Sequence, residues 1–168
     1  MSSDAKALPK NGLLPWTKSC FVCGEANPHG LRLKSRLEDG RPVITYTPSD
    51  RDLGWKQRVH GGITMTLLDE VMTWAAILAS RKPCVAAEVN SRLRKPVSAG
   101  EQVRVIAEVE TVKSKVVCTS ARMETADGTV LATATGKYMP MGGKELAFNA
   151  GDFVEGPGAI TFAEIFGG

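Results

Sequence analysis

The stretch VHGGITMTLLDEVMTWAAILASR, residues 59–81, decides the fold. After the glycine pair at 61 and 62 it contains no proline and no further glycine, and apolar residues fall on nearly every side of the helix that it predicts. A helix that is apolar all round is buried in a core rather than laid on a surface. The sequence therefore predicts one long central helix around which the rest of the chain is arranged.

A polar stripe interrupts this helix on one side. Its members are three or four residues apart, which places them on one face: Thr66, Asp69, Glu70 and Thr73. Burying a carboxylate is costly unless it is hydrogen-bonded or used, so we favour a functional role for Asp69 over a purely structural one. Glu70 points about 100° away around the helix. It is either the rival acid or a structural partner of a basic residue such as Arg58 or Arg81.

Alternating apolar and polar residues predict antiparallel strands on both sides of the helix. They cover residues 31–38 and 43–47 before it and 85–93, 102–112, 116–125 and 129–139 after it, with hairpin turns at 39–40 and 126–128. The order β-β-α-β-β-β-β predicts an α+β fold, an antiparallel sheet packed around one helix. Small residues on the inward faces leave room for that helix: Ala87, Ala107, Ala121, Ala132 and Ala134.

The two ends of the chain lack a sustained pattern. Residues 1–19 are expected to be a tail that docks through Leu13, Leu14 and Trp16, and residues 20–140 the domain itself. Residues 141–168, rich in glycine and with apolar anchors such as Phe148, are expected to be an extended tail that wraps the domain or a partner.

Composition narrows the function classes. The chain has 168 residues, 43% of them hydrophobic and 23% charged, which suits one globular domain. A net charge of +3 without a block of Lys or Arg argues against a nucleic-acid partner but suits a small anionic ligand. No run approaches the apolar length of a membrane span and the N-terminus does not read as a signal peptide, so we expect no membrane partner and a cytoplasmic location.

A Cys-x-x-Cys pair, Cys20 and Cys23, precedes the first strand. It offers half a zinc site with His29 as a possible third ligand, but a second such pair is absent, and Cys84 and Cys118 fall on strands. We favour a structural turn over a metal site. No metal, no disulfide framework and no cofactor are expected.

Three motifs together resemble a known family. They are VHGG followed by an apolar helix with Asp69 nine residues past the histidine, the strand and turn EVNSRLRKPVSAGEQVRV, and the final hairpin ADGTVLATATGKY. Over roughly residues 20–140 the chain resembles the hotdog-fold acyl-CoA thioesterases, specifically the phenylacetate-pathway and human thioesterase-superfamily-like group. The resemblance implies a sheet wrapped around one helix, and dimers or tetramers with sites at the dimer interface.

The resemblance also implies roles for residues. The N–H of Gly61 would polarise the thioester carbonyl, His60 would shape the loop, Asp69 would act on water or on the carbonyl carbon, and Thr73 would lie near the water. Substrate contacts are expected from Gln57, Gly62, Thr66, Asn90, Arg92, Arg94 and Lys95. His60 is as readily interpreted as a loop residue whose ring bonds a backbone carbonyl.

One position departs from the family pattern. Relatives commonly carry Asn or Gln six residues before the histidine, where this chain has Gly54, and the nearest amide is Gln57. Either Gln57 substitutes through a shifted loop or that contact is missing. The departure keeps open a second interpretation, a non-catalytic module that binds acyl-CoA or another acyl ligand.

Chemistry and distance lead to the same site independently of the family. Unpaired N–H groups at a helix N-terminus suit a developing oxyanion, and glycines let a ligand approach them closely. His60 and Asp69 are nine residues apart, about 13 Å along a helix, so two chains must combine if both act on one carbonyl.

We therefore expect a homo-oligomeric thioesterase, a dimer or tetramer, that releases a free acid and coenzyme A. Basic residues at strand ends would hold the coenzyme A phosphates, although ordinary solvated strand ends are the alternative: Arg92, Arg94, Lys95, Lys113 and Lys115.

Overall fold

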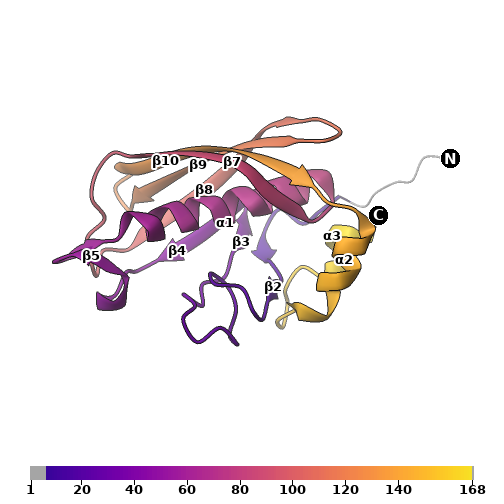
Figure 1. Ribbon diagram of the computed structural model, residues 1–168, viewed down its shortest axis with the longest axis horizontal. Helices are drawn as coiled ribbons and strands as arrows, with labels where there is room; N and C mark the ends of the chain where they lie inside the picture. Colours follow the sequence, from indigo (N-terminus) through magenta and orange to yellow (C-terminus); the bar gives the residue numbers. More distant parts are fainter. Residues whose placement is uncertain (1–6, 168) are drawn as a thin grey trace.

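A long central helix, α1 (Gly61–Ser80), lies along one face of a seven-stranded antiparallel sheet (Figure 1). The computed structural model describes residues 7–167. Across the sheet the order is β1 (Gly12–Leu13), β3 (Arg36–Glu38), β4 (Arg41–Tyr46), β8 (Val103–Val112), β9 (Val117–Thr125), β10 (Val130–Pro140) and β7 (Cys84–Leu93). The predicted α+β fold with one central helix is confirmed.

Two small two-stranded sheets and several short helices complete the described chain. β2 (Trp16–Thr17) pairs with β11 (Phe153–Val154), and β5 (Leu53–Trp55) pairs with β6 (Arg58–Val59). The helical pieces are η1 (Asp50–Asp52), α2 (Gly143–Asn149), η2 (Ala150–Asp152) and α3 (Phe162–Phe166).

The apolar surface of α1 forms the core. Leu67, Leu68, Val71 and Met72 are fully buried, and burial of each such side chain contributes roughly 1.5–3 kcal/mol. Four of the five small residues expected to face the helix are buried, which lets the sheet approach closely: Ala107, Ala121, Ala132 and Ala134. The helix begins at Gly61, two residues later than the quoted stretch, and ends where Arg81 adopts a left-handed conformation with φ 57°.

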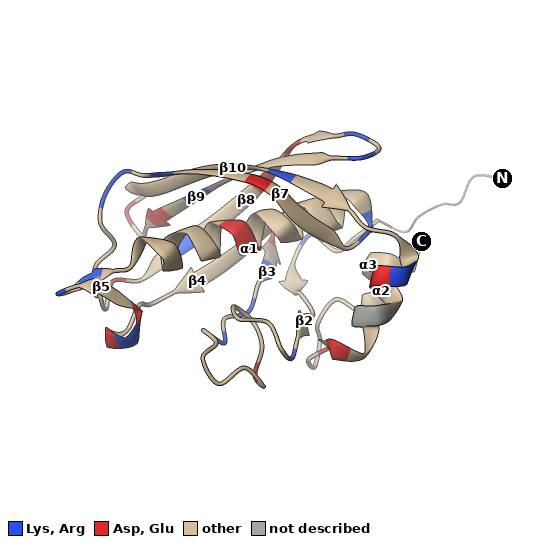
Figure 2. Cartoon of the chain, in the orientation of Figure 1, with Lys and Arg blue, Asp and Glu red and all other residues tan. Residues whose placement is uncertain are grey.

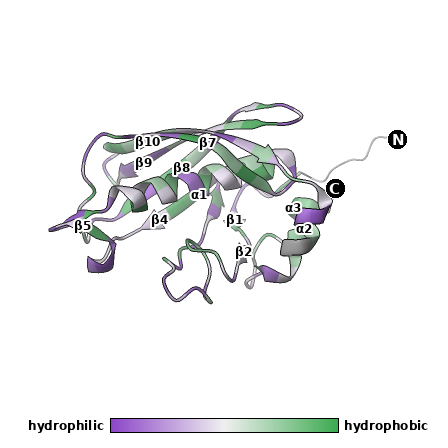
Figure 3. Ribbon diagram, viewed as in Figure 1, coloured by the Kyte–Doolittle hydropathy of each residue, from purple (hydrophilic) through white to green (hydrophobic). Residues whose placement is uncertain are grey.

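The fifth small residue, Ala87, is exposed, and this expectation was wrong. β7 is the last strand of the sheet and pairs with β10 alone, so α1 does not cover it as it covers the inner strands. Val85, Val89 and Leu93 of β7 are also exposed. Figure 3 shows hydrophobic residues along α1 and along much of the sheet.

The expectation that no run approaches a membrane-spanning length needs correction. α1 is long and apolar enough to cross a membrane by length and composition, with a mean hydropathy of 1.3, but half of that window is buried inside the protein. The same apolar surface is what a core helix of a soluble protein requires.

The predicted strand at residues 31–38 is shorter than expected. Only Arg36–Glu38 is a strand, because the N–H groups of Leu31 and Leu33 donate to the carbonyls of Phe21 and Val22, at 2.8 Å each, rather than to a neighbouring strand. Arg32 between them has φ 57°, which is incompatible with an extended strand. The two predicted hairpin turns are confirmed, with positive φ at Gly40 and Gly128.

The two ends of the chain pack into the same core as α1. Leu14 and Trp16 are buried, as expected for a docked N-terminal segment. The C-terminal segment is not extended as expected: it forms α2 and α3 and buries Ile160 and Ile165 in the core. Residues 1–6 and the side chain of Phe148 lie outside the described part, so the docking expected of them is not addressed.

Gly136 in β10 makes room for a buried aromatic ring. Tyr138, two residues on, is fully buried. A Cβ at position 136 would lie 2.5 Å from the Cε2 atom of the Tyr138 ring, closer than real contacts allow. The backbone of β10 therefore lies directly against this ring only because residue 136 has no side chain.

We expect Gly136→Ala to lower the free energy of unfolding by about 1–3 kcal/mol, since the ring or the strand must move to accept the methyl group. Chemical denaturation followed by fluorescence measures the change. Gly143→Ala is the matched control, because a Cβ there meets nothing within 4 Å, and it should change stability by less than about 0.5 kcal/mol. Equal losses in the two variants would contradict the close contact at Tyr138.

Candidate functional site

His60 caps the N-terminus of α1. Its Nδ1 atom accepts a hydrogen bond from the N–H of Gly62 at 3.0 Å, and its own backbone N–H donates to the carbonyl of Asp52 at 2.8 Å. The ring thus accepts a hydrogen bond from a backbone N–H and holds the start of α1 in place. The bond also occupies the N–H of Gly62, so that group does not face a ligand.

The N–H of Gly61 is left without an acceptor among the described residues. It is the first N–H of the helix, where the helix dipole favours negative charge. A Cβ at Gly61 would lie 2.9 Å from the Cδ1 atom of Leu93 in β7, the end of an exposed side chain that would have to shift. Gly61 is therefore suited to receive an oxyanion, the role expected for it.

An open groove lies beside this helix N-terminus. It has a volume of about 320 Å³ and is lined by Trp55, Arg58, Val59, Gly61, Thr64, Leu93, Arg94, Lys95, Pro96 and Val97. Figure 2 shows Lys and Arg on the loops at the end of the molecule where α1 begins. Trp55 is 84% exposed, the most exposed large hydrophobic side chain in the described chain. Two expected phosphate-binding residues, Arg94 and Lys95, are thus brought to Gly61, together with Trp55 and Arg58, which sequence reasoning did not assign to substrate.

Other expected contacts lie elsewhere. In the pairing of β7 with β10, Asn90 is opposite Thr135 and Arg92 is opposite Thr133. These two threonines alternate with the buried residues of β10 that face α1, so Asn90 and Arg92 point away from the helix. The amide of Asn90 donates to Glu88 at 2.8 Å. Gln57 is exposed in the β5–β6 turn and does not line the groove, nor does Thr66.

Lys113 and Lys115 were expected near Arg94 but lie at the other end of the molecule. They occupy the turn between β8 and β9, where Lys113 lines a separate cavity with Ala79, Ser80 and Pro140, beyond the C-terminus of α1. The basic residues therefore do not form one cluster.

Asp69 is held by a tyrosine that sequence reasoning missed. The hydroxyl of Tyr138 donates to the carboxylate of Asp69 at 2.7 Å. The side chain of Thr73 is hydrogen-bonded to the same Tyr138 hydroxyl. Burial, followed by the hydrogen bond to Asp69, raises the pKa of Tyr138, so this phenol remains a donor. The only signal in the sequence was an aromatic residue two positions after a glycine in the last strand.

Gly61 and Asp69 remain apart within one chain. Eight residues separate them on α1, about 12 Å at 1.5 Å per residue, and Asp69 does not line the groove at Gly61. The separation expected from the sequence therefore persists in the folded chain.

Gly54 packs directly against His60. A Cβ at position 54 would lie 3.0 Å from the Cδ2 atom of His60 and 3.1 Å from its Cα. An amide side chain at this position would displace the histidine that caps the helix. Because Gln57 does not reach the groove either, neither position presents an amide beside Gly61.

Glu70 is not paired with Arg58 or Arg81, as one interpretation had it. Its carboxylate lies against Cys20 and Cys23 and is hydrogen-bonded with Trp74. Burial, reinforced by the nearby Cys20, raises the pKa of Glu70 to about 8. Asp69 and Glu70 are therefore neighbours in sequence with separate surroundings.

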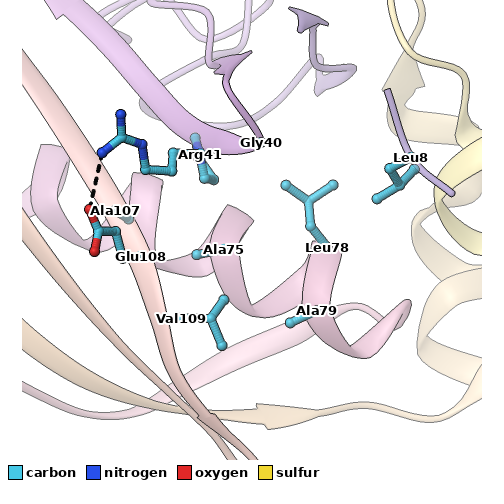
Figure 4. Close-up of a pocket in the computed structure, with 10 residues that line it drawn as sticks. Leu8, Gly40, Arg41, Ala75, Leu78, Ala79, Ala107, Glu108 and Val109 are labelled. Atoms are coloured by element: carbon cyan, nitrogen blue, oxygen red, sulfur yellow. Dashed lines mark hydrogen bonds and ion pairs between the residues drawn. The ribbon is translucent and has the colours of Figure 1, made fainter. Parts of the chain in front are cut away.

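A larger cavity of about 530 Å³ lies along the C-terminal half of α1 (Figure 4). Its lining is mostly apolar, with Ala75, Leu78 and Val109 among it, and Arg41 and Glu108 form an ion pair of 3.2 Å on one side. None of the residues expected to act on substrate lines it, so the groove at Gly61 is the better candidate.

Comparisons with known proteins agree with the fold. The model of the thioesterase superfamily matches residues 56–132. A solved structure of a thioesterase superfamily protein is 25% identical, with a TM-score of 0.67 over 73% of this chain and 63% of that one. No curated protein matches the sequence.

Two further solved structures share the fold. Escherichia coli PaaI, from the phenylacetic acid degradation operon, is 23% identical with a TM-score of 0.59, over 66% of this chain and 78% of PaaI. A hypothetical thioesterase from Streptococcus pneumoniae, solved with coenzyme A, is 18% identical with a TM-score of 0.58, over 62% of this chain and 84% of that one. Residues 56–132, which carry the helix, Gly61 and Asp69, thus match the model of the thioesterase superfamily, and the sheet wrapped around α1 has the hotdog fold of these structures.

Proposed function

We propose that this protein is an acyl-CoA thioesterase whose site is completed by two copies of the chain. The observation that carries the proposal is the pair of groups on α1: an N–H at Gly61 without an acceptor in the described chain, and a carboxylate at Asp69 held by Tyr138. Hydrolysis of a thioester needs a donor for the developing oxyanion and an activated water or a nucleophile. These two groups supply both needs.

In this mechanism the Gly61 N–H donates to the carbonyl oxygen of the thioester. Asp69 activates water or attacks the carbonyl carbon directly. When Asp69 activates water, the water oxygen bonds to the acyl carbon, the carbon–sulfur bond breaks, and the sulfur leaves as the thiol of coenzyme A with the proton that Asp69 took from water. When Asp69 attacks directly, its oxygen first takes the acyl group as an anhydride, and water then hydrolyses the anhydride to the free acid. Tyr138 keeps Asp69 in place by donating to it, and no dissociable cofactor is required.

The free edge of β7 supports assembly of two chains. It is ten residues long, pairs only with β10, and exposes Val85, Val89 and Leu93. An unpaired apolar edge strand is a template for pairing with another strand. Antiparallel pairing of two β7 strands about a two-fold axis sets the two α1 helices side by side and antiparallel. Asp69 of one copy then approaches Gly61 of the other, so the separation of about 12 Å along one helix no longer keeps the two groups from acting on one carbonyl.

The groove at Gly61 supports a coenzyme A ester as substrate. Arg58, Arg94 and Lys95 line it and provide positive charge for phosphates. The exposed indole of Trp55 offers a flat face of the kind on which a base stacks. The Streptococcus pneumoniae structure that shares this fold was solved with coenzyme A.

A second candidate function is an acyl-CoA binding module without catalysis. Gly54 favours it, because glycine presents no amide at this position and a side chain there would require His60 to shift. Assays of hydrolysis with short, long and aromatic acyl-CoAs, detecting the free thiol, separate the two functions. Binding of coenzyme A esters without release of thiol would support the module and contradict the thioesterase.

Asp69→Asn should lower kcat by at least about a hundredfold, because it removes the charge of the group that activates water while keeping its shape. The free-thiol assay with the best acyl-CoA measures it, and thermal unfolding checks that the fold is retained. Glu70→Gln is the control from the adjacent position and should reduce turnover less. An unchanged rate in Asp69→Asn with an inactive Glu70→Gln would assign the acid to Glu70 instead.

Light scattering should show at least a dimer at micromolar concentration. Val89→Lys places a charge in the middle of the exposed edge of β7 and should shift the protein toward monomer, with loss of activity in the same samples. Lys113→Gln, which changes an exposed side chain in the turn between β8 and β9, should leave the oligomer intact. A fully active monomer would exclude a site shared between chains.

Combined replacement Arg94→Gln and Lys95→Gln should raise KM for acyl-CoA by about tenfold while kcat changes little, because ion pairs of exposed side chains contribute up to about 1 kcal/mol each and about 1.4 kcal/mol is a factor of ten. The control is Lys113→Gln with Lys115→Gln, at the opposite end of the molecule. If the control pair raised KM and the Arg94 and Lys95 pair did not, the assignment of the coenzyme A phosphates to the groove at Gly61 would be wrong.

A further inference from the structure

A second cluster of reactive side chains lies on the other side of Glu70. The Sγ atoms of Cys20 and Cys23 and a carboxylate oxygen of Glu70 all lie within 4.8 Å of one another. Two segments distant in sequence contribute to it: the turn at residues 20–24, here called the knuckle, and the middle of α1. The proposed thioesterase mechanism uses none of the three groups.

The knuckle holds Cys20 in a conformation suited to a thiolate. The backbone N–H groups of Val22 and Cys23 both point at the Cys20 Sγ atom, at 3.2 and 3.3 Å. Donors directed at sulfur favour its charged form, which is the form that binds a metal ion. Gly24 closes the turn by donating to the Cys20 carbonyl at 2.9 Å.

The backbone of the knuckle is fixed on several sides. Leu31 and Leu33 donate to the carbonyls of Phe21 and Val22, and the Lys34 ammonium donates to the carbonyl of Cys23. A Cβ at Gly24 would lie 2.3 Å from the Lys18 carbonyl oxygen, so only glycine fits this position. The two sulfur atoms are thus presented by a turn that is already formed.

Glu70 brings a carboxylate to these sulfur atoms from the core helix. Among the described residues it forms no ion pair, although it lies beside its acidic neighbour Asp69. Three groups that each carry negative charge when deprotonated therefore converge at one partly buried point, and Lys34, which binds the Cys23 carbonyl, forms its ion pair with Glu25 and not with them. Convergence of this kind is costly unless protons or a metal ion neutralise it.

We propose that Cys20, Cys23 and Glu70 bind one zinc ion, with water as the fourth ligand. In a tetrahedral zinc site with Zn–S near 2.3 Å and Zn–O near 2.0 Å, ligand atoms are about 3.5–3.8 Å apart. The present separations, all within 4.8 Å, need to contract by only about 1 Å. Thiolates select zinc over magnesium or calcium. Cys20 is half-buried, which leaves one side open for water.

The ion would fasten the N-terminal segment to α1 at the residue next to Asp69. This proposal differs from the expectation of a turn without metal, because the sequence offered only His29 as a third ligand. His29 is exposed and is not a member of the cluster. The third ligand comes from α1 instead.

The test uses the full chain, purified under reducing conditions, stripped with a chelator and then supplied with zinc. Elemental analysis after gel filtration should find one zinc per chain. Cobalt(II) in place of zinc should give a thiolate-to-cobalt charge-transfer band and strong visible bands of tetrahedral cobalt. Zinc should also raise the thermal midpoint, since it binds only the folded chain.

Variants separate this site from adventitious binding. Cys20→Ser and Cys23→Ser should each abolish stoichiometric binding, and Glu70→Gln should weaken it by about tenfold or more. Cys118→Ser, a half-buried thiol outside the cluster, should bind zinc as the unmodified chain does.

Three results would overturn the proposal. They are failure of the stripped protein to take up zinc, wild-type affinity in Glu70→Gln, and a disulfide between Cys20 and Cys23 in the reduced preparation. None of these measurements depends on hydrolysis, so the outcome is separate from that of the thioesterase assay.

Discussion

The apolar surface of α1 is the constraint on which the rest of the structure depends. A helix that is hydrophobic on nearly every side must be covered on nearly every side. The sheet covers one face through its small residues, and the core that contains α1 also contains Leu14 and Val22 from the N-terminal segment and Ile160 and Ile165 from the C-terminal one. The N-terminal and C-terminal segments are therefore parts of the core, and Figure 1 shows β2 and α2 on the side of α1 away from strands β7 to β10.

The polar stripe on α1 follows from the same constraint. Each carboxylate in a covered helix needs its own partner, and the two adjacent acids find them in different layers. Asp69 turns toward the sheet, where the Tyr138 hydroxyl donates to it, while Glu70 turns toward the knuckle and its two sulfur atoms. Two neighbouring residues thus acquire separate chemistry because a helix rotates by about 100° per residue.

Periodicity made the fold predictable from the sequence. The central helix, the sheet order and both hairpin turns follow from patterns within short windows. Ala87 was misplaced because alternation tells which residues share a face, not which strand lies at the edge of the sheet. The short helices after Pro140 are set by packing against the core, which glycine-rich sequence does not reveal.

The site was predictable only where a motif carried it. Gly61, His60 and Asp69 were assigned through the family resemblance, and Arg94 and Lys95 were assigned as basic residues at the end of a strand. Tyr138 and the Cys20–Cys23–Glu70 cluster depend on contacts between distant parts of the chain. Asn90 and Arg92 were assigned to the wrong side because the direction of an edge-strand side chain depends on pairing with β10.

Tyr138 gives the pairing of β10 a meaning beyond stability. Side chains alternate between the two faces of a strand, so a shift of β10 by one residue would send this hydroxyl out to solvent and place Lys137 over the helix. The β7–β10 pairing already carries an irregularity between Lys137 and Tyr138. If a single-residue insertion or deletion in the 126–128 turn shifted β10 by one residue, Tyr138 would still be present in the sequence, but its hydroxyl would no longer lie beside Asp69. The length of that turn therefore helps to keep the Tyr138 hydroxyl beside Asp69.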